Sequence, residues 1–426
     1  MLDKNGVLAL SVTAGIGVGY LLGQRQQVAA KKPAGKCVAK NESQDEIERL
    51  IRPNILELTP YRCARDDYDQ GILLDANENS LGPPLEPHHQ LRQEQLERYP
   101  CPYQKDLKQK LANYRNAASS EYKIGTENIF LGVGSDEAID LIIRVACTPR
   151  VDSILITPPT YGMYQVCANI HDVNIIAVPL EVQAPASNPK GLIDSQPLPA
   201  FHINPQKILA AVTPETKIIF LCSPGNPTAN SVRVIDILTI LESPRYKGLV
   251  VVDEAYIDFS DSQSLCTLVK KYKRLVVLQT LSKAFGLAGI RLGSAFGDPK
   301  LIQILNNVKA PYNINKLTAK VAHEALDSIA QVQSKIDLIK KEKERVIKAL
   351  RQLSFVKAIY ASDSNFVLFE VPNALKVYRE MADRGVVIRF RGNQLLLNDC
   401  LRATIGSRDE NDKMLELLER VSAELA

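Results

Sequence analysis

Short runs of Val, Ile and Leu alternate with segments of helical periodicity through the middle of the chain. Five such runs occupy residues 153–157, 173–178, 217–221, 248–252 and 274–279. Runs that are apolar at nearly every position are typical of strands buried on both faces, as in parallel sheets. The pattern therefore predicts an α/β fold whose large domain has a mainly parallel sheet flanked by helices.

The pattern changes after residue 310. Residues 316–353 form a lysine-rich stretch of helical periodicity, which we expect to be bent or broken once. Strand-like runs follow at 355–360, 365–370, 386–390 and 401–405, with helical patterns at 374–384 and 409–425. We therefore predict a smaller C-terminal α/β domain over residues 311–426. A large domain over 81–310 and an N-terminal arm over 46–80 precede it.

Residues 1–45 differ from the rest of the chain. The uncharged run 6–23 is followed by five basic residues, Arg25, Lys31, Lys32, Lys36 and Lys40. Its length approaches that of a transmembrane helix, and the basic residues after it would leave the remainder of the chain in the cytoplasm. Its many glycines keep its hydrophobicity modest, so an organellar targeting segment and a disordered extension are alternatives to a membrane anchor. We expect any membrane contact only through residues 6–23.

The chain has 426 residues, of which 45% are hydrophobic and 23% charged, so it can bury a large core. A net charge of +4 without a dense basic stripe argues against nucleic-acid binding. The eight cysteines lack paired metal-ligand spacing and the chain has only five histidines, so we expect no metal site. This cysteine usage favours free thiols in a reducing compartment.

Polar residues follow three of the predicted strands, and ligands collect at the carboxyl ends of strands in open α/β sheets. We therefore expect these three segments to face one site. They are Cys222-Ser-Pro-Gly-Asn-Pro-Thr228, Asp253-Glu-Ala-Tyr256 and Thr280-Leu-Ser-Lys283.

A glycine turn at Gly132 and Gly134 stands between a predicted strand and a predicted helix. Ser135 is expected to cap that helix, beside free amides that suit a phosphate. An ordinary strand–helix turn is the alternative.

Lys283 lies at a predicted strand end among small residues. Burial there can lower the pKa of its amine and make it a nucleophile toward carbonyls. That is the requirement for a Schiff base with pyridoxal 5′-phosphate (PLP), whose ring acts as an electron sink. A surface lysine at a turn is the alternative.

The other requirements of a PLP site occur in the chain together with Lys283. Such a site needs a carboxylate for the ring nitrogen, donors to the ring oxygen, a phosphate cradle and an aromatic face. The candidates, in that order, are Asp253; Asn226 and Tyr256; Gly134, Ser135, Ser282 and Arg291; and Tyr161.

The three strand-end segments resemble motifs of the fold-type I PLP-dependent aminotransferases, and Thr280-Leu-Ser-Lys-Ala-Phe-Gly-Leu-Ala-Gly289 also resembles the class II lysine signature. From about residue 47 to the C-terminus, the chain resembles the histidinol-phosphate aminotransferases more narrowly. The marks are Leu58-Thr-Pro-Tyr61, Asp75-Ala-Asn-Glu-Asn79, Arg98-Tyr-Pro100, Gly134-Ser-Asp-Glu-Ala-Ile139, Gly385-Val-Val-Ile-Arg389 and Cys400-Leu-Arg-Ala-Thr-Ile-Gly406.

The resemblance implies amino-group transfer between L-histidinol phosphate and 2-oxoglutarate in L-histidine biosynthesis. It implies that Lys283 holds PLP and moves the proton, and that Asp136 joins the phosphate turn. It also implies a homodimer in which Tyr99 reaches the cofactor phosphate of the neighbouring subunit. Arg402 would bind the glutamate carboxylate, while Arg389, Tyr61 and Asn79 would meet the phosphate or imidazole end of the other substrate.

The sequence departs from the family pattern at two places, and neither involves the residues of the expected chemistry. Ser80 stands where proline is common, and residues 185–205 carry a Pro/Ser-rich loop. The alternatives within the fold are an aromatic or broad-specificity aminotransferase and a threonine-phosphate decarboxylase. A binding or scaffold protein with a PLP-enzyme fold is the alternative from another class. The intact set around Lys283 argues against that last interpretation.

Overall fold

A computed structural model of the chain describes residues 45–59, 76–79, 81, 83–86, 89–183 and 198–425. The chain divides into two units, Met1–Ser43 and Gln44–Ala426, and the description below concerns the second. The expectations for residues 6–23 and for Tyr61 lie outside the described residues, as does most of the predicted 185–205 loop. Among the helices described, none is both long enough and apolar enough to span a membrane.

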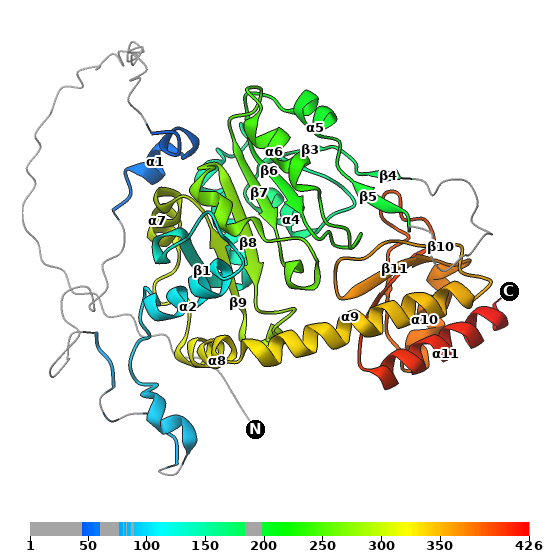
Figure 1. Cartoon of the computed structure of the whole chain (residues 1–426). Coiled ribbons are helices and arrows are strands. Elements are labelled where there is room, and N and C mark those ends of the chain that lie inside the picture. Colours follow the sequence, from blue (N-terminus) through cyan, green and yellow to red (C-terminus); the bar gives the residue numbers. More distant parts are fainter. Residues whose placement is uncertain are drawn as a thin grey trace, which may run out of the picture. The chain divides into compact units, whose positions relative to one another are not determined.

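A seven-stranded sheet forms the centre of the molecule, with strand order β1-β9-β8-β7-β6-β2-β3 (Figure 1). In this order, each pair of adjacent strands from β8 to β3 is parallel. The five strands predicted from the apolar runs are all present. The strands are β1 (Ile129–Val133), β2 (Ser153–Ile156), β3 (Asn174–Ala177), β6 (Thr216–Cys222), β7 (Leu249–Asp253), β8 (Leu275–Thr280) and β9 (Leu292–Phe296).

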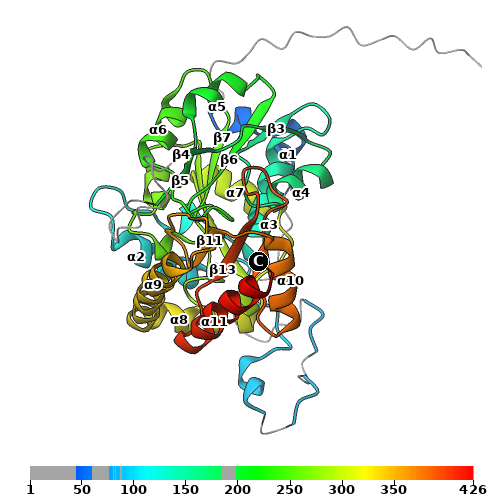
Figure 2. The same ribbon diagram turned by 90° about the vertical axis from the view of Figure 1, so that its right-hand side faces the viewer.

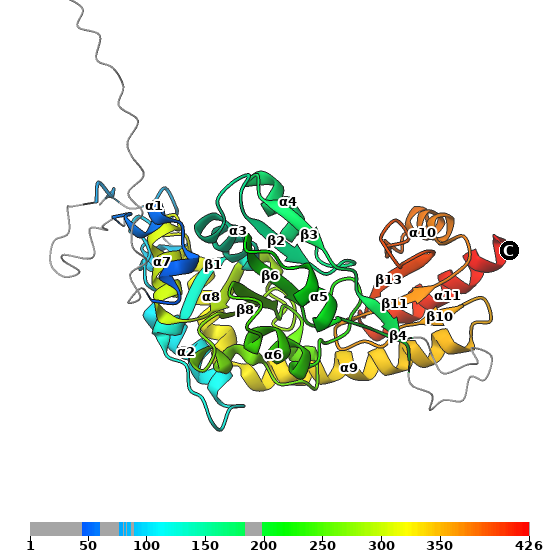
Figure 3. The same cartoon turned by 90° about the horizontal axis from the view of Figure 1, so that it is seen from above.

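Alternate residues of the central strands enter two different hydrophobic cores. On β7, Val250 and Val252 join one core, whereas Leu249 and Val251 join the other. Both faces are covered by helices, which is why the strands are apolar throughout (Figure 3). One face packs on α2 (Lys105–Asn116), α5 (Pro205–Ala211), α6 (Val234–Glu242) and α8 (Lys316–Asp327). The other packs on α1 (Pro53–Leu56), α3 (Gly134–Ala146), α4 (Met163–Ile170) and α7 (Pro299–Val308).

Strand β9 runs antiparallel to both of its neighbours, β1 and β8, and the sequence patterns did not predict it. Its five residues include Gly293 and Ser294, so it lacks the branched apolar run of the other strands. No helix longer than three residues separates it from β8, so the chain returns directly, and a direct return gives antiparallel pairing. This return brings Arg291 beside the start of α3, where the Gly134 N–H donates to the Arg291 carbonyl at 2.9 Å.

The C-terminal part carries a second sheet, antiparallel throughout, in the order β10-β11-β13-β12 (Figure 2). One of its faces packs on helices α9, α10 and α11. The elements are α9 (Ile329–Gln352), β10 (Ala358–Ile359), β11 (Phe366–Glu370), α10 (Ala374–Asp383), β12 (Arg389–Phe390), β13 (Cys400–Thr404) and α11 (Arg408–Glu424). A separate antiparallel pair, β4 (Glu181–Gln183) with β5 (Ala200–His202), was not predicted.

The long helical stretch breaks once, at Ser328 between α8 and α9, as its pattern predicted. Helix α9 contributes to two cores: Val332 and Ile336 belong to a large-sheet core, whereas Val346 and Leu350 belong to the small-sheet core. Helix α9 therefore extends from a core of the large sheet into the core of the small sheet. The domain boundaries predicted near residues 45, 80 and 310 remain predictions.

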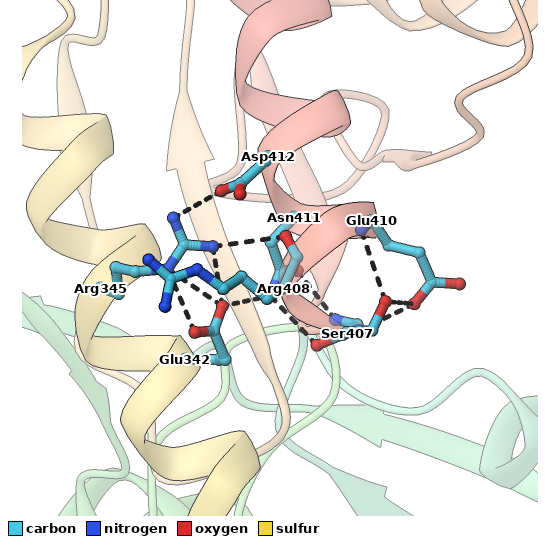
Figure 4. A network of polar contacts seen from close by, with 8 residues as sticks. Glu342, Arg345, Ser407, Arg408, Glu410, Asn411 and Asp412 are labelled. Carbon is cyan, nitrogen blue, oxygen red and sulfur yellow. Dashed lines mark hydrogen bonds and ion pairs between the residues drawn. The ribbon is translucent and has the colours of Figure 1, made fainter.

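Helix α11 is fastened to α9 by a polar network (Figure 4). Ser407 and Glu410 form a capping box at the start of α11, and Asn411, which is buried, donates to Glu342 Oε2 at 3.0 Å. Arg345 pairs with Glu342 at 2.7 Å and with Asp412 at 2.6 Å. These contacts hold the end of β13, and so the strand that carries Arg402, against the long helix.

Candidate active site

The carboxyl ends of β6, β7 and β8 enclose one cavity of about 180 Å³, as the three polar strand ends predicted. Most of the side chains predicted for a cofactor site line it together. They are Ser135, Asp136, Tyr161, Asn226, Asp253, Tyr256, Ser282, Lys283 and Arg291, joined by Cys222, Ala255, Thr280 and Ala288. These residues come from segments almost 160 positions apart, and the parallel strands bring them to one edge of the sheet.

Lys283 lies in the turn after β8, with its Nζ 5.5 Å from the centre of the Tyr256 ring. Its side chain is accessible because it faces the open cavity, although protein atoms surround it on the other sides. Burial lowers the pKa of the Lys283 amine, and the nearby positive charges of Arg402 and Arg291 lower it further. A lowered pKa increases the fraction of neutral amine, which is the nucleophilic form.

Asp253 ends β7 at the base of the cavity and is 2% exposed. Its Oδ2 accepts a hydrogen bond from the Tyr164 hydroxyl at 2.7 Å, and its Oδ1 accepts from the Ala255 N–H at 3.1 Å. Burial raises the pKa of Asp253 from 3.8 to about 6, although both hydrogen bonds oppose that rise. A cation placed beside this carboxylate would favour its ionised form.

The predicted turn between strand and helix at Gly134 is present, with one correction. Helix α3 begins at Gly134 with no side-chain cap, so Ser135 lies inside the first turn and does not cap the helix as expected. The N–H of the residue before the helix, Val133, donates to Glu137 Oε2 at 2.6 Å instead. Because amides of a first helical turn have no partner within the helix, they remain available to an anion at the cavity.

Two glycines create the close approach at this turn. Gly134 has φ +71°, a left-handed conformation that favours glycine, and a Cβ there would lie 2.4 Å from Arg291 Nη2. A Cβ on Gly293 would lie 2.2 Å from the backbone nitrogen of Ser135. The absence of both side chains lets β9 and its preceding arginine lie against the start of α3.

Asp136 orients two side chains of the cavity. Its Oδ1 accepts from the Tyr161 hydroxyl at 3.0 Å, and its Oδ2 lies 3.3 Å from Arg291 Nη2. Arg291 Nη1 also reaches Ser282 Oγ at 3.4 Å, and Ser282 Oγ accepts from Thr280 Oγ1 at 2.8 Å. A serine, an arginine and a helix start therefore converge on one end of the cavity, which is suitable for binding an anion.

The small sheet meets the cavity through Arg402. Its Nη1 donates to Asn226 Oδ1, which leaves the Asn226 amide nitrogen free to donate to a ligand. Its guanidinium lies 5.0 Å from the centre of the Phe366 ring, and Phe366 packs edge-on against Tyr256 at 5.2 Å. Burial lowers the pKa of Arg402 to about 10, with neighbouring Arg391 contributing. Arg389, on the adjacent strand, stands directly opposite Arg402.

Of the predicted site residues that the structure describes, Gly134, Arg389, Arg402, Tyr99 and Asn79 are not among those that line this cavity, and the last two also make no contact with it. Tyr99 is 52% exposed and stacks on Tyr312 with ring centres 4.5 Å apart. Asn79 is exposed, and its Oδ1 accepts from the Leu81 N–H at 3.1 Å. Neither residue appears among those that line the cavity of a single subunit.

Sequence reasoning missed three side chains that belong to this region. Tyr164 lies in α4, three positions after the predicted Tyr161, and its hydroxyl donates to Asp253; no helical pattern links the two tyrosines, because Tyr161 precedes the helix. Thr280 precedes Ser282 by two positions at the end of β8, where strand alternation places both on one side. Arg391 follows Arg389 by two positions, and the same periodicity could have identified it.

A family model described as aminotransferase class I and II matches residues 69–420 of the chain. The chain belongs to the class I and II aminotransferases. Relatives named histidinol-phosphate aminotransferase include that of Candida maltosa, 44% identical in an alignment of 398 residues that covers 88% of this chain and 98% of the relative. Another, from Saccharomyces cerevisiae, is 42% identical over 89% of this chain and 99% of its own length. This aminotransferase is therefore a member of the histidinol-phosphate aminotransferase family.

Solved structures confirm the fold of this aminotransferase. One is the histidinol-phosphate aminotransferase of Sinorhizobium meliloti in complex with pyridoxal 5′-phosphate. It superposes with a TM-score of 0.67 at 22% identity, covering 82% of this chain and 90% of that one. The family is PLP-dependent, so the fold class and the cofactor predicted from the sequence are both confirmed.

The residues of the cavity fit this cofactor. PLP requires an amine, an anion for its ring nitrogen and donors for its phosphate. The cavity has a lysine amine, the buried carboxylate of Asp253, and an end suited to an anion where Ser135, Ser282 and Arg291 converge. The two glycines leave room at that end for the backbone amides of α3 to approach a phosphate.

Proposed function

We propose that this aminotransferase transfers the amino group of L-histidinol phosphate to 2-oxoglutarate, forming imidazole-acetol phosphate and L-glutamate in L-histidine biosynthesis. One observation supports this most directly: Lys283, Asp253 and Arg291 line one cavity that Arg402 reaches through Asn226. The relatives with the same predicted activity are 44% and 42% identical over nearly their whole lengths.

PLP, when bound, supplies an electron sink for the bond that is broken at the substrate α-carbon. We propose that Lys283 holds it through Nζ and that Asp253 pairs with its ring nitrogen. Tyr256 and the Asn226 amide would donate to its ring oxygen, and Tyr161 would cover its face. Its phosphate would be held by the α3 amides after Gly134, including those of Ser135 and Asp136, together with the Ser282 hydroxyl and the Arg291 guanidinium.

Lys283 would also move the proton. The lowered pKa of Lys283 increases the fraction of neutral Nζ, the form that can accept a proton from the substrate α-carbon and return it to a neighbouring carbon. A general base works best when its pKa lies near the operating pH. Arg402 and Arg291 contribute to this property because both positive charges disfavour the ammonium form of Lys283.

The substrate end would be formed by arginines of the small sheet. We propose that Arg402 binds the carboxylate of glutamate and that Arg389, with Tyr61 and Asn79, meets the phosphate or imidazole end of histidinol phosphate. Arginine suits both anions because its planar fork pairs with carboxylate and with phosphate oxygens. One pocket can then serve two substrates in alternate half-reactions.

We further propose that the enzyme is a homodimer. Tyr99 is exposed and lies outside the cavity of its own subunit, which is consistent with a hydroxyl that serves the cofactor phosphate of the neighbouring subunit. Asn79, likewise exposed, would approach the neighbouring site. Sedimentation of the wild type and activity of Tyr99→Phe test this assembly: a monomer with full activity contradicts it.

The catalytic unit is proposed to work in the cytoplasm, with residues 1–45 serving only as an anchor or targeting segment. The decisive assay offers L-histidinol phosphate and 2-oxoglutarate to the full chain and to a chain lacking residues 1–45. We expect glutamate from both. Phenylalanine and threonine phosphate are the control substrates. Glutamate from phenylalanine but not from histidinol phosphate contradicts the proposed substrate, and release of carbon dioxide from threonine phosphate indicates the decarboxylase alternative.

A further inference from the structure

Three arginines share one face of the small sheet. Arg389 on β12 stands directly opposite Arg402 on β13. The Arg391 N–H donates to the Cys400 carbonyl at 2.8 Å, which continues the same antiparallel register one step beyond β12. Side chains two positions apart on a strand point to the same face. Arg391 therefore lies on the face that carries Arg389 and Arg402.

That face of the small sheet is the one directed toward the active site. Arg402 donates to Asn226 of the cavity and lies over Phe366, which contacts Tyr256. The opposite face of the sheet, with Val367 and Leu401, packs into the core formed with α9, α10 and α11. A ligand that reaches the Arg391 side chain therefore comes from the cavity side.

The positive charge on this face has no carboxylate to balance it. Within the described part of the chain, none of the three arginines forms an ion pair with an acidic side chain. Like charges directly opposite on neighbouring strands destabilise a sheet. The Nε atoms of Arg391 and Arg402 are also buried without a hydrogen-bond acceptor, which is costly for a charged donor. Burial and the neighbouring charge of Arg389 lower the pKa of Arg391. An anion would relieve each of these costs.

We propose that Arg391 is a specificity-determining residue that, with Arg389 and Arg402, binds the phosphate dianion of the amine substrate. The identity of that substrate rests on the proposed function. A carboxylate carries one negative charge and two acceptor oxygens, whereas a phosphate monoester carries nearly two charges and three such oxygens. A third guanidinium therefore adds affinity for the phosphate ester and little for the carboxylate substrate.

The test measures the two half-reactions separately in Arg391→Gln. We expect kcat/KM for L-histidinol phosphate to fall by roughly 10- to 100-fold, the usual range for a lost hydrogen bond to a charged group. The half-reaction with L-glutamate should change less than about threefold, and that with L-histidinol, which lacks the phosphate, should not change. Arg379→Gln is the matched control: it removes the same charge from an exposed position on α10, and both half-reactions should stay at the wild-type rate.

The pH dependence gives a readout that a general loss of structure would not produce. The second pKa of a phosphate monoester is about 6, so the difference between wild type and Arg391→Gln should shrink as the pH falls below that value. Equal losses in the glutamate and histidinol phosphate half-reactions overturn the proposal, as does the absence of any loss.

A separate measurement distinguishes failure of this proposal from failure of the proposed function. If the wild type does not convert L-histidinol phosphate, calorimetric titration of the PLP-bound enzyme with inorganic phosphate still tests the site. At least fivefold weaker phosphate binding by Arg391→Gln than by the wild type supports it. Equal binding, or no binding to the wild type, overturns it.

Discussion

The two ends of the active site differ in how their charges are balanced. At the end proposed to hold the cofactor, charged groups already have partners: Arg291 lies beside Asp136, and Asp253 accepts two hydrogen bonds. At the end proposed to bind the substrates, Arg389, Arg391 and Arg402 share a sheet face with no acidic partner among the described residues. The charged side chains at the first end are held in place by protein partners, whereas the arginines at the second end have no anionic partner among the described residues.

This difference matches what each end has to bind. A cofactor that stays through many turnovers benefits from groups held in one orientation before it arrives, because less freedom is then lost on binding. Apart from the reacting amino group, the two substrates that alternate share only an anionic group, so unpaired arginines can serve both. The prediction that follows is that substitutions at the cofactor end affect every substrate equally, whereas a substitution at the substrate end discriminates between substrates where, as proposed for Arg391, only one of them uses that arginine.

The largest effect is expected at Lys283. Lys283→Ala should lower kcat for both half-reactions on the order of 10⁵-fold or more, since it removes both the amine that holds the cofactor and the proton carrier. The variant should also lack the visible absorbance of the wild-type enzyme. Lys376→Ala, which changes an exposed lysine of α10, is the control and should remain active. A protein that retains activity without Lys283 would contradict the assignment of both roles.

Asp253→Asn should have the second-largest effect, a decrease in kcat of roughly 100- to 1,000-fold, which is comparable to the removal of one preorganised electrostatic contact. The amide has nearly the same shape, and the Tyr164 hydroxyl can still donate to its oxygen, so the loss would come from charge. Both half-reactions should fall together. A loss confined to one substrate would show that the cofactor end is not uniform in the way described above.

The same substitution should have the opposite effect on the stability of the cofactor-free protein. Folding raises the pKa of Asp253 from 3.8 to about 6, so the folded state binds its proton more tightly than the unfolded state does. The Asp253 carboxyl therefore does not lower the free energy of unfolding below about pH 4, and it lowers that free energy by its full amount above about pH 6. Because each unit of difference between the two pKa values corresponds to about 1.4 kcal/mol, this decrease in the free energy of unfolding is at most about 3 kcal/mol.

Urea unfolding of the cofactor-free wild type and Asp253→Asn at pH 5 and pH 8 checks this sign. The variant should gain stability relative to the wild type as the pH rises, because its amide never ionises. Other titrating groups, including the neighbouring Glu254, are common to both proteins and cancel in the comparison. An unchanged difference at the two pH values would mean that the Asp253 carboxyl is not held in a poorly solvated position.

Arg402→Gln is expected to raise KM for both substrates by about 30-fold or more, the usual cost of removing one partner of a buried charged contact. It should also raise the pKa of Lys283, because the Arg402 charge now lowers it. Reaction of Lys283 with an amine-specific reagent as a function of pH, in the cofactor-free protein, measures that shift. Arg379→Gln again serves as the control, and no shift in Arg402→Gln would contradict the electrostatic link between the two ends.

The smallest effect is expected for Tyr164→Phe, which removes one hydrogen bond to Asp253. A typical bond of this kind contributes about 1 kcal/mol, so cofactor affinity should fall only about fivefold. Tyr161→Phe, which removes the hydroxyl bonded to Asp136 instead, is the matched comparison. Absorbance titration with PLP measures both, and a loss of 100-fold in Tyr164→Phe would give this buried tyrosine a larger role than its geometry supports.

The sequence predicted the sheet and most of the cavity because both depend on local, repeated patterns. Apolar runs mark β2, β3, β6, β7 and β8, and the polar residues after them, such as Asn226 and Asp253, must gather where parallel strands end. Strand β9 was missed because it contains glycine and serine in place of a branched apolar run, so its pairing depends on the neighbouring strands.

The small sheet shows a second reason for incomplete prediction. Arg389 and Arg402 were found through motifs, but their direct opposition depends on the register of β12 with β13, which no local pattern sets. The Ser135 cap failed for a related reason: Arg291, from the distant segment before β9, takes the place beside the helix start, and the helix begins two residues earlier than expected, at Gly134. Contacts between distant segments are therefore what the sequence patterns left undetermined.

Helix α9 has a consequence for how this enzyme melts. Its first half is part of the core under the large sheet, and its second half is part of the core under the small one. A continuous helix transmits disorder along its axis, because each backbone hydrogen bond supports the next turn. The two sheets are thus joined by a shared element, and we expect the catalytic unit to unfold in a single cooperative transition.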